Sequence, residues 1–257
     1  MAEGRTYRRI VVFTPPTSGT GSLWRIATAF KPKDMPYVSF IDDCLRRGIA
    51  INDIKKEVFP EYGCFLFNQP HLFNFNQDFS DTQFILNFRD PRDMSCNQYF
   101  WVFSHPNPSM SEEALALHRD RVRKAGIDHF ALEHDHRWFF ENHILFATQD
   151  RLRARALVCS YIQLCFDTNG LIDRVAHTLG STDTGLIERV KLGEHPSALA
   201  GANKWVGQKW EGADLFPGRA RVELKALTYA VLTARYAKAL AALQSMDDAR
   251  YGFFYGA

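Results

Sequence analysis

The sequence FRDPRD spans residues 88–93 and directly follows TQFILN at residues 82–87, a run typical of a buried strand. Two arginines, Arg89 and Arg92, would then lie at the carboxyl edge of a sheet, where open α/β sheets bind their ligands. A guanidinium group suits phosphate because it donates two parallel hydrogen bonds. The stretch therefore predicts a phosphate-binding site on an α/β sheet.

A second stretch that suits an anion lies near the N-terminus. Residues 9–13 (RIVVF) predict a short strand, residues 14–22 (TPPTSGTGS) a loop of small residues, and a helical pattern follows. Glycines let backbone amides approach an anion, and a helix N-terminus adds a favourable dipole. No lysine follows Gly21, so the spacing of a nucleotide-triphosphatase loop is missing. Taken alone, the loop is equally well explained as a tight connection between strand and helix.

The rest of the chain alternates predicted strands and helices. Further strands are predicted at residues 37–40, 63–68 and 154–159, and helices at residues 40–59, from Ser111, at 170–179 with Gly180 after the end, and at 220–246. Residues from about 190 to 218 are predicted to be irregular. This order favours an α/β fold with a mostly parallel five-stranded sheet and helices on both faces.

Composition narrows the class of protein. The chain has 257 residues, of which 46% are hydrophobic, so we expect a single domain over residues 1–257 with a sizeable core. A net charge of +2 gives no support to a nucleic-acid or membrane-surface role. Five cysteines without a CxxC pair indicate free thiols in a reducing compartment. We find no signal peptide and no membrane-spanning run, and expect a soluble, cytoplasmic protein.

Together the two stretches resemble the motifs of the sulfotransferases that use 3′-phosphoadenosine 5′-phosphosulfate (PAPS). In that family P-K-S-G-T-T cradles the 5′-phosphosulfate, and residues 16–22 here read PTSGTGS. The family's R-x-P-[KR]-D-x-x-x-S-x-Y binds the 3′-phosphate, and residues 89–99 read RDPRDMSCNQY. The resemblance implies a three-layer fold like that of the P-loop NTPases. It also implies cofactor contacts from Thr17, Ser18, Gly19, Thr20, Gly21, Ser22, Arg89 and Asn97, the last in place of a serine.

The resemblance extends to a candidate catalytic base. Residues 68–73 (NQPHLF) are similar to the family's K-[ST]-H-L-P segment, which gives His71 that role. The role makes chemical sense, because an acceptor hydroxyl that attacks sulfur must lose its proton and neutral imidazole accepts one near pH 7. A loop histidine at the end of a strand explains the position equally well without any chemistry.

Three further segments resemble the family more weakly. Residues 159–164 (CSYIQL) are similar to a Y-E-D-L segment whose tyrosine lies beside the adenine, which points to Tyr161. Residues 173–180 resemble a helix that serves packing. Residues 202–210 (ANKWVGQKW) come near a closing R-K-G-x-x-G-D-W loop, where Lys204 or Lys209 would replace the arginine. Either lysine could equally be a surface charge.

The main departure from the family is Thr17, which stands where the family has a lysine. Arg25, Lys31 or Lys204 could supply the cation, or the loop amides could suffice. The function expected is transfer of sulfonate from PAPS to a hydroxyl or amine of a small molecule or glycan, with release of adenosine 3′,5′-bisphosphate (PAP) and no metal. The alternatives are a non-catalytic module that binds PAP or PAPS and a P-loop-type small-molecule kinase. The oligomeric state stays open.

Overall fold

At the centre of the protein lies a sheet of five parallel strands in the order β2-β3-β1-β4-β5. We describe it from a computed structural model, over residues 7–107, 110–195, 198 and 217–246. The strands are β1 (Arg9–Phe13), β2 (Tyr37–Ser39), β3 (Gly63–Phe67), β4 (Thr82–Phe88) and β5 (Ala156–Ser160). The predicted parallel five-stranded sheet is therefore confirmed.

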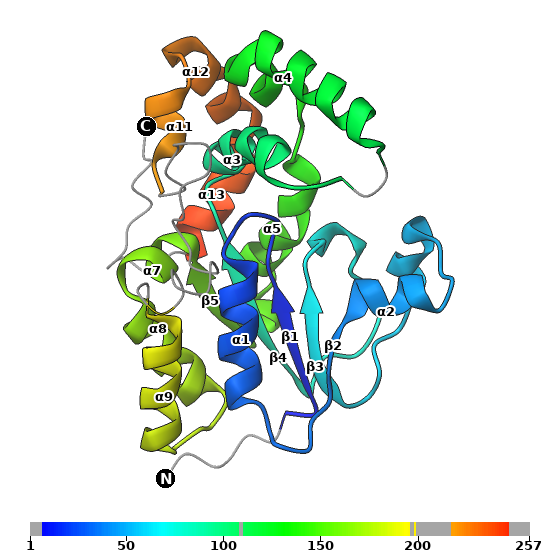
Figure 1. The fold of residues 1–257 in the computed structure, drawn as a ribbon. Helices are drawn as coiled ribbons and strands as arrows, with labels where there is room; N and C mark the ends of the chain where they lie inside the picture. The colour runs from blue at the N-terminus through cyan, green and yellow to red at the C-terminus, as the bar shows by residue number, and fades with distance from the viewer. Residues whose placement is uncertain (1–6, 108–109, 196–197, 199–216, 247–257) are drawn as a thin grey trace.

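The sheet is buried on both faces. All residues of β1 and β4 are buried, and their apolar side chains divide between two cores. One core joins Ile10 and Val12 to the helices on one face, and the other joins Phe13 and Phe84 to a cluster of phenylalanines on the opposite face. A strand covered on both faces needs a continuous apolar sequence, as RIVVF has. The result is the three-layer arrangement of Figure 1.

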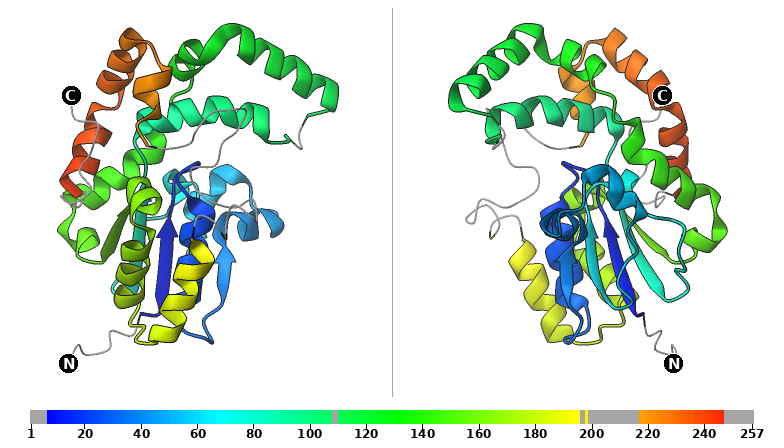
Figure 2. Two further views of the ribbon diagram at one scale, coloured as in Figure 1. Left: turned by 60° about the vertical axis from the view of Figure 1, so that its left-hand side comes forward. Right: turned by 90° about the vertical axis from the view of Figure 1, so that its right-hand side faces the viewer.

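The helices fall into two layers beside the sheet and a third group beyond its carboxyl edge. The first core is covered by α1 (Thr20–Phe30), α7 (Tyr161–Phe166), α8 (Thr168–Thr178) and α9 (Thr184–Glu194). The other face is covered by α2 (Phe40–Arg46), α5 (Glu141–Thr148), α6 (Asp150–Arg153), α13 (Ala237–Met246) and the short helices η1 (Ile51–Lys56), η2 (Pro70–Leu72) and η3 (Arg137–Phe140). Above the strand ends lie α3 (Pro91–Ser104), α4 (Glu112–Glu133), α11 (Arg219–Glu223) and α12 (Ala226–Arg235), as Figures 1 and 2 show.

Three predicted element boundaries are wrong. The helix expected over residues 40–59 ends at Arg46, because the chain reverses at Gly48 in a left-handed conformation (φ +80°) and continues as η1. The helix expected over residues 220–246 is three helices: Leu224 is extended, and the N–H of Lys225 donates to the Asp128 side chain instead of a helical carbonyl. The irregular segment expected from residue 190 begins only after α9, and most of its remainder lies outside the described residues.

Two other sequence predictions agree with the structure. Gly180 follows the end of α8 with φ +76°, and its N–H donates to the carbonyl of His177. This is the left-handed helix end that glycine favours. All five cysteines are free, and four of them are buried.

Over the described residues, no helix combines the length and apolar character that crossing a membrane requires.

Candidate functional site

The loop after β1 carries the first predicted motif and leads into α1. Its hydroxyl groups bond within the loop, since Thr14 Oγ1 lies 3.0 Å from Thr20 Oγ1. Gly19 caps α1 with φ +75°, and its carbonyl accepts from the N–H of Leu23. Thr17 also has a positive φ (58°), as no other non-glycine residue of the described chain does. The loop thus turns tightly at the carboxyl edge of the sheet.

A polar residue in the buried strand β4 anchors this loop. Asn87 is fully buried, and its Nδ2 donates to the carbonyl of Ser18 at 2.6 Å. The carbonyl of Asn87 accepts from Nε2 of the buried His143 at 2.8 Å. The sequence analysis did not single out either residue. The sequence does contain one signal for Asn87, because an asparagine near the end of an apolar strand must find a hydrogen-bond partner if its amide is buried.

Arg89 joins the two predicted motifs. Its side chain is buried, and Nη1 donates to the carbonyl of Thr17 at 2.7 Å. The amide oxygen of Asn97, in the orientation that satisfies both groups, accepts from the Arg89 guanidinium at 2.6 Å from Nη2. The guanidinium also lies 4.0 Å from the ring centroid of Tyr161. The structure therefore brings together four residues that span 144 positions of the chain, from Thr17 to Tyr161.

Arg92, the second arginine of the opening motif, has a different environment. Asp90 caps α3 by accepting from the N–H of Arg92, and the same carboxylate pairs with the Arg92 guanidinium at 2.7 Å. Both side chains are buried, and Arg92 Nη1 also donates to Thr233 Oγ1 at 3.0 Å. Arg92 thus stabilises the junction of α3 and α12, whereas Arg89 contacts the loop.

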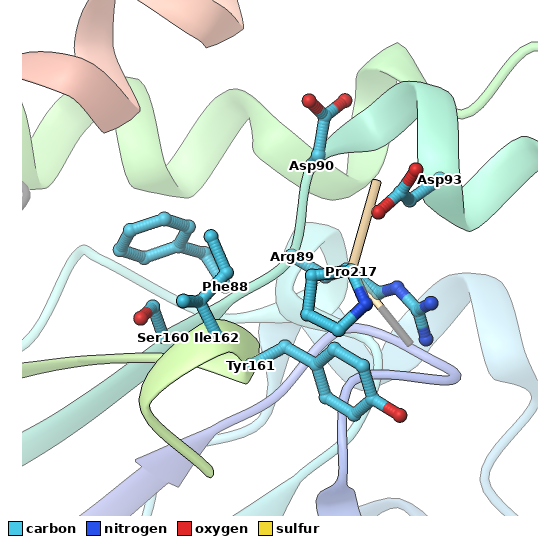
Figure 3. A pocket seen from close by; sticks show the side chains of 8 residues that line it. All are labelled: Phe88, Arg89, Asp90, Asp93, Ser160, Tyr161, Ile162 and Pro217. Atoms are coloured by element: carbon cyan, nitrogen blue, oxygen red, sulfur yellow. The ribbon is translucent and has the colours of Figure 1, made fainter. Parts of the chain in front are cut away.

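A pocket opens beside Arg89, at the ends of β4 and β5. Its walls come from the start of α3, the start of α7 and Pro217, and it encloses about 200 Å³, part of which is open to solvent. Figure 3 shows the Tyr161 ring and the Arg89 side chain on one side and Asp93 on another. Burial and the neighbouring Asp90 raise the pKa of Asp93. The pocket combines an aromatic face with a guanidinium, which suits a ligand that is both planar and anionic.

His71 lies in η2, directly after β3. Because β3 is the neighbour of β1 and the N–H of Thr14 donates to the carbonyl of Phe67, the end of β3 lies beside the start of the loop. The imidazole packs edge-on against Trp138 at 4.0 Å between ring centroids. Burial lowers its pKa to about 4, and its Nδ1 is buried without a hydrogen-bond partner among the described residues. The ring is therefore neutral at pH 7.

The structure describes two of the cations that were expected to replace the family's loop lysine, Arg25 and Lys31. Arg25 lies beside the first turn of α1, where it donates to Ser22 Oγ at 2.9 Å, but its charge is paired with the buried carboxylate of Glu194 at 2.6 Å. Lys31 follows the last residue of α1, about 16 Å from the loop at 1.5 Å per residue, so it cannot serve. Lys204 and Lys209 lie outside the described residues.

Comparisons with known proteins bear on the fold alone. No protein-family profile and no curated protein matches the sequence. Mouse sulfotransferase SULT7A1, solved as a complex with PAP, matches with a TM-score of 0.59 and 11% identity, over 93% of this chain and 85% of that one. Retinol dehydratase, solved with androsterone and the inactive cofactor PAP, matches with a TM-score of 0.50 and 14% identity, over 94% and 82%. On this likeness and its parallel sheet, the chain has the sulfotransferase fold.

Proposed function

We propose that this protein is a PAPS-dependent sulfotransferase formed by a single domain over residues 1–257. The observation that carries the proposal is the contact of Arg89 with both Thr17 and Asn97. It unites the two sequence motifs in one buried site on a fold shared with proteins that were solved with PAP. A site of this kind requires residues far apart in the sequence to converge, which chance similarity of short motifs does not explain.

The proposed cofactor site has three parts. Arg89 and Asn97 would hold the 3′-phosphate, since a guanidinium and an amide both donate to phosphate oxygens. Tyr161 would lie against the adenine. The amides of Ser18, Gly19, Thr20, Gly21 and Ser22, at the N-terminus of α1, would hold the 5′-phosphosulfate. Thr17 offers a buried hydroxyl that has no hydrogen-bond partner within the described part of the chain. Lys204 is proposed as a further contact on the motif alone.

The proposed reaction is an in-line displacement at sulfur. The acceptor oxygen or nitrogen forms a bond to sulfur while the bond from sulfur to the bridging phosphate oxygen breaks, and PAP leaves. His71 accepts the proton that the acceptor loses. Its ring is neutral at pH 7, as a base must be, and its Nδ1 has no hydrogen-bond partner among the described residues. The lowered pKa makes it a weaker base than an exposed histidine. The loop amides and the α1 dipole stabilise the charge on the departing phosphate.

The proposal also includes a class of acceptor and a cellular location. We propose a small molecule or glycan as the acceptor, since retinol dehydratase was solved with androsterone, and a cytoplasmic location, which suits five free thiols. The aromatic side chains beside His71 could line the acceptor site, although several of them, such as Phe73, belong to the buried core.

A specific observation favours a second candidate, a non-catalytic module that binds PAP or PAPS. Among the described cations that could replace the family's lysine, Arg25 lies near the loop and its charge is already paired with Glu194. Removing one preorganised group that stabilises developing charge costs about 3–4 kcal/mol in the barrier. The kinase alternative lacks support, because the loop has no lysine and ends in Gly21 and Ser22.

Transfer of radiolabelled sulfonate from PAPS to a panel of acceptors tests the proposal. We expect His71→Ala to lower turnover by about 10²–10⁴-fold, the usual contribution of a general base, while PAP binding by calorimetry is retained. His177→Ala, at an exposed position in α8, is the control and should leave turnover unchanged. Undiminished turnover in His71→Ala would remove His71 from the mechanism.

The same measurements on the wild type distinguish the alternatives. PAP binding without transfer to any acceptor would favour the binding module, and binding of ATP instead of PAP would favour the kinase.

A further inference from the structure

Arg219, the first residue of α11, is a buried cation with donors that nothing in the described chain satisfies. Its side chain is 3% exposed. Nε and Nη1 are buried and have no hydrogen-bond partner among the described residues, and Nη2 reaches Glu223 only at 3.5 Å. The ion pair with Glu223 leaves Nε and Nη1 unsatisfied, and a buried donor without a hydrogen bond is unfavourable and rarely retained without a use. The free donors of Arg219 therefore indicate an anion that binds there.

Asp93 fixes the position of Arg219 relative to α3. Its carboxylate accepts from the N–H of Gly218 at 2.7 Å and from the N–H of Ala220 at 2.8 Å. Gly218 has φ +91°, a conformation that glycine adopts without strain, so the chain can turn into α11 against the start of α3. The residue between the two amides is Arg219. Its backbone is thus held by two bonds to the residue four positions after Arg89.

The Arg219 guanidinium lies over the face of α3 that carries Asn97. It is 3.5 Å from the ring centroid of Phe100. Phe100 follows Asn97 by three residues, so the two side chains share one face of the helix. The Arg89 guanidinium contacts Asn97 on the same face. Two guanidinium groups from distant parts of the chain therefore lie on one face of α3.

The electrostatics agree with this proximity. Burial lowers the pKa of Arg219, and the positive charge of Arg89 adds to the effect. Both guanidinium groups act to lower the pKa of the Cys96 thiol, which burial raises. Of the carboxylates near Arg219, Glu223 forms an ion pair with it at 3.5 Å, and Asp93 accepts from backbone amides. Like charges held this close are stabilised by an anion between them.

We propose that Arg219 is the second guanidinium of the anion site at Arg89 and Asn97, and that the pair binds a phosphomonoester dianion. Under the proposed function, on which this assignment rests, that group is the 3′-phosphate of PAPS and PAP. Arg219 then performs the part that the sequence analysis assigned to Lys204 or Lys209. It also makes the site selective for nucleotides with a 3′-phosphate, because a nucleotide with only a 5′-phosphate offers no anion to the Arg219 donors Nε and Nη1.

The variant Arg219→Met separates a ligand role from a structural one. Methionine keeps an unbranched apolar chain over Phe100 and removes the buried charge, so we expect the free protein to be at least as stable as the wild type. We expect its affinity for PAP, measured by calorimetry, to fall about 10–100-fold, as for the loss of a charged hydrogen-bonding partner. Its affinity for adenosine 5′-phosphate should not change. Arg221→Met, exposed on the same helix, is the matched control.

Each outcome decides one question. Equal affinity of Arg219→Met and the wild type for PAP overturns the role of Arg219 and leaves the proposed function intact. Stabilisation by inorganic phosphate, measured as a thermal shift, tests the anion site without the nucleotide. If phosphate stabilises the wild type and not Arg219→Met while PAP fails to bind, the anion site stands and the proposed function fails. If neither phosphate nor PAP binds the wild type, both are overturned.

Discussion

At Thr17 the backbone has a conformation that suits few side chains. A left-handed residue other than glycine costs about 1–2 kcal/mol, and β-branched residues adopt it least readily. The conformation persists because the contacts on either side fix the loop: Arg89 donates to the carbonyl of Thr17, and Asn87 donates to the carbonyl of Ser18. Strain of this kind is commonly found where a loop is held ready for a ligand.

Thr17→Gly should therefore be tolerated better than an ordinary change to glycine. Relief of the strain offsets the greater freedom of glycine in the unfolded chain, and we expect a change in the free energy of unfolding between zero and a gain of about 1 kcal/mol. Urea denaturation provides the measurement. Thr28→Gly, within α1, is the comparison and should lose stability, because glycine is a poor helix former. Equal losses in the two variants would show that Thr17 is not strained.

Single residues were predictable from the sequence to different degrees. The motif residues Arg89, Asn97 and Tyr161 could be named, and the structure brings them together, although their roles remain proposals. Asn87 and Arg219 were not named, because each matters through a partner that is distant in the sequence. Nothing near Arg219 in the chain indicates that its side chain is buried over Phe100.

At the scale of elements, the start of α3 links the sheet to the helices above it. Asp90 has two functions there: its carboxylate caps the helix through the N–H of Arg92 and neutralises the buried Arg92 guanidinium. Pro91 follows at the first helical position, where its missing N–H costs nothing. One side chain thus sets both where α3 begins and how it packs against α12.

Two substitutions of Asp90 separate these functions. Asparagine still caps a helix, so Asp90→Asn removes the charge and leaves Arg92 buried without a carboxylate; we expect a loss of about 3–5 kcal/mol in the free energy of unfolding. Asp90→Ala also removes the cap and should cost about 1 kcal/mol more. Guanidinium denaturation measures both. Asp43→Asn, which removes the exposed ion pairs of Asp43 with Arg46 and Arg47, should cost less than about 1 kcal/mol. A similarly small loss in Asp90→Asn would contradict the importance of the buried pair.

The elements themselves were predictable where local sequence decides them. The apolar strands and the glycine after α8 have local signals, and the structure confirms them. The breaks within residues 220–246 have none, because an alanine- and leucine-rich sequence favours one long helix. They arise from contacts with other parts of the chain, such as the bond from Lys225 to Asp128. Local periodicity cannot report such contacts.

At the scale of the whole molecule, buried histidines make stability depend on pH. Burial lowers the pKa of His136 and of His143 to about 4 each. The unfolded chain, with an ordinary histidine pKa of about 6.5, takes up these protons first as the pH falls. Stability is therefore fully present above about pH 6.5 and is lost as the pH falls toward 4. His71 adds a smaller effect in the same direction, since its ring is only half buried.

We expect the free energy of unfolding to fall by up to about 1.4 kcal/mol per pH unit for each of these two buried histidines between pH 6.5 and 4. Asp93 opposes part of this fall, because its raised pKa makes the folded state bind a proton first. Urea denaturation at pH 7, 6 and 5 measures the slope. His136→Gln should reduce it, and the exposed His177→Gln should not. A stability that is constant over this range would contradict the burial of these rings.

The position of β1 in the middle of the sheet has a consequence for how the chain folds. β1 is made first, but its two neighbours are β3 and β4, with Arg9 opposite Gly63 and Thr82. At a synthesis rate of about 5–20 residues per second, RIVVF keeps at least one edge unpaired for on the order of ten seconds, a state that invites aggregation. β4 ends this wait and, in the same event, delivers Asn87 and Arg89 to the loop after β1. Pairing of the second edge of β1 and anchoring of the loop are thus one step of folding.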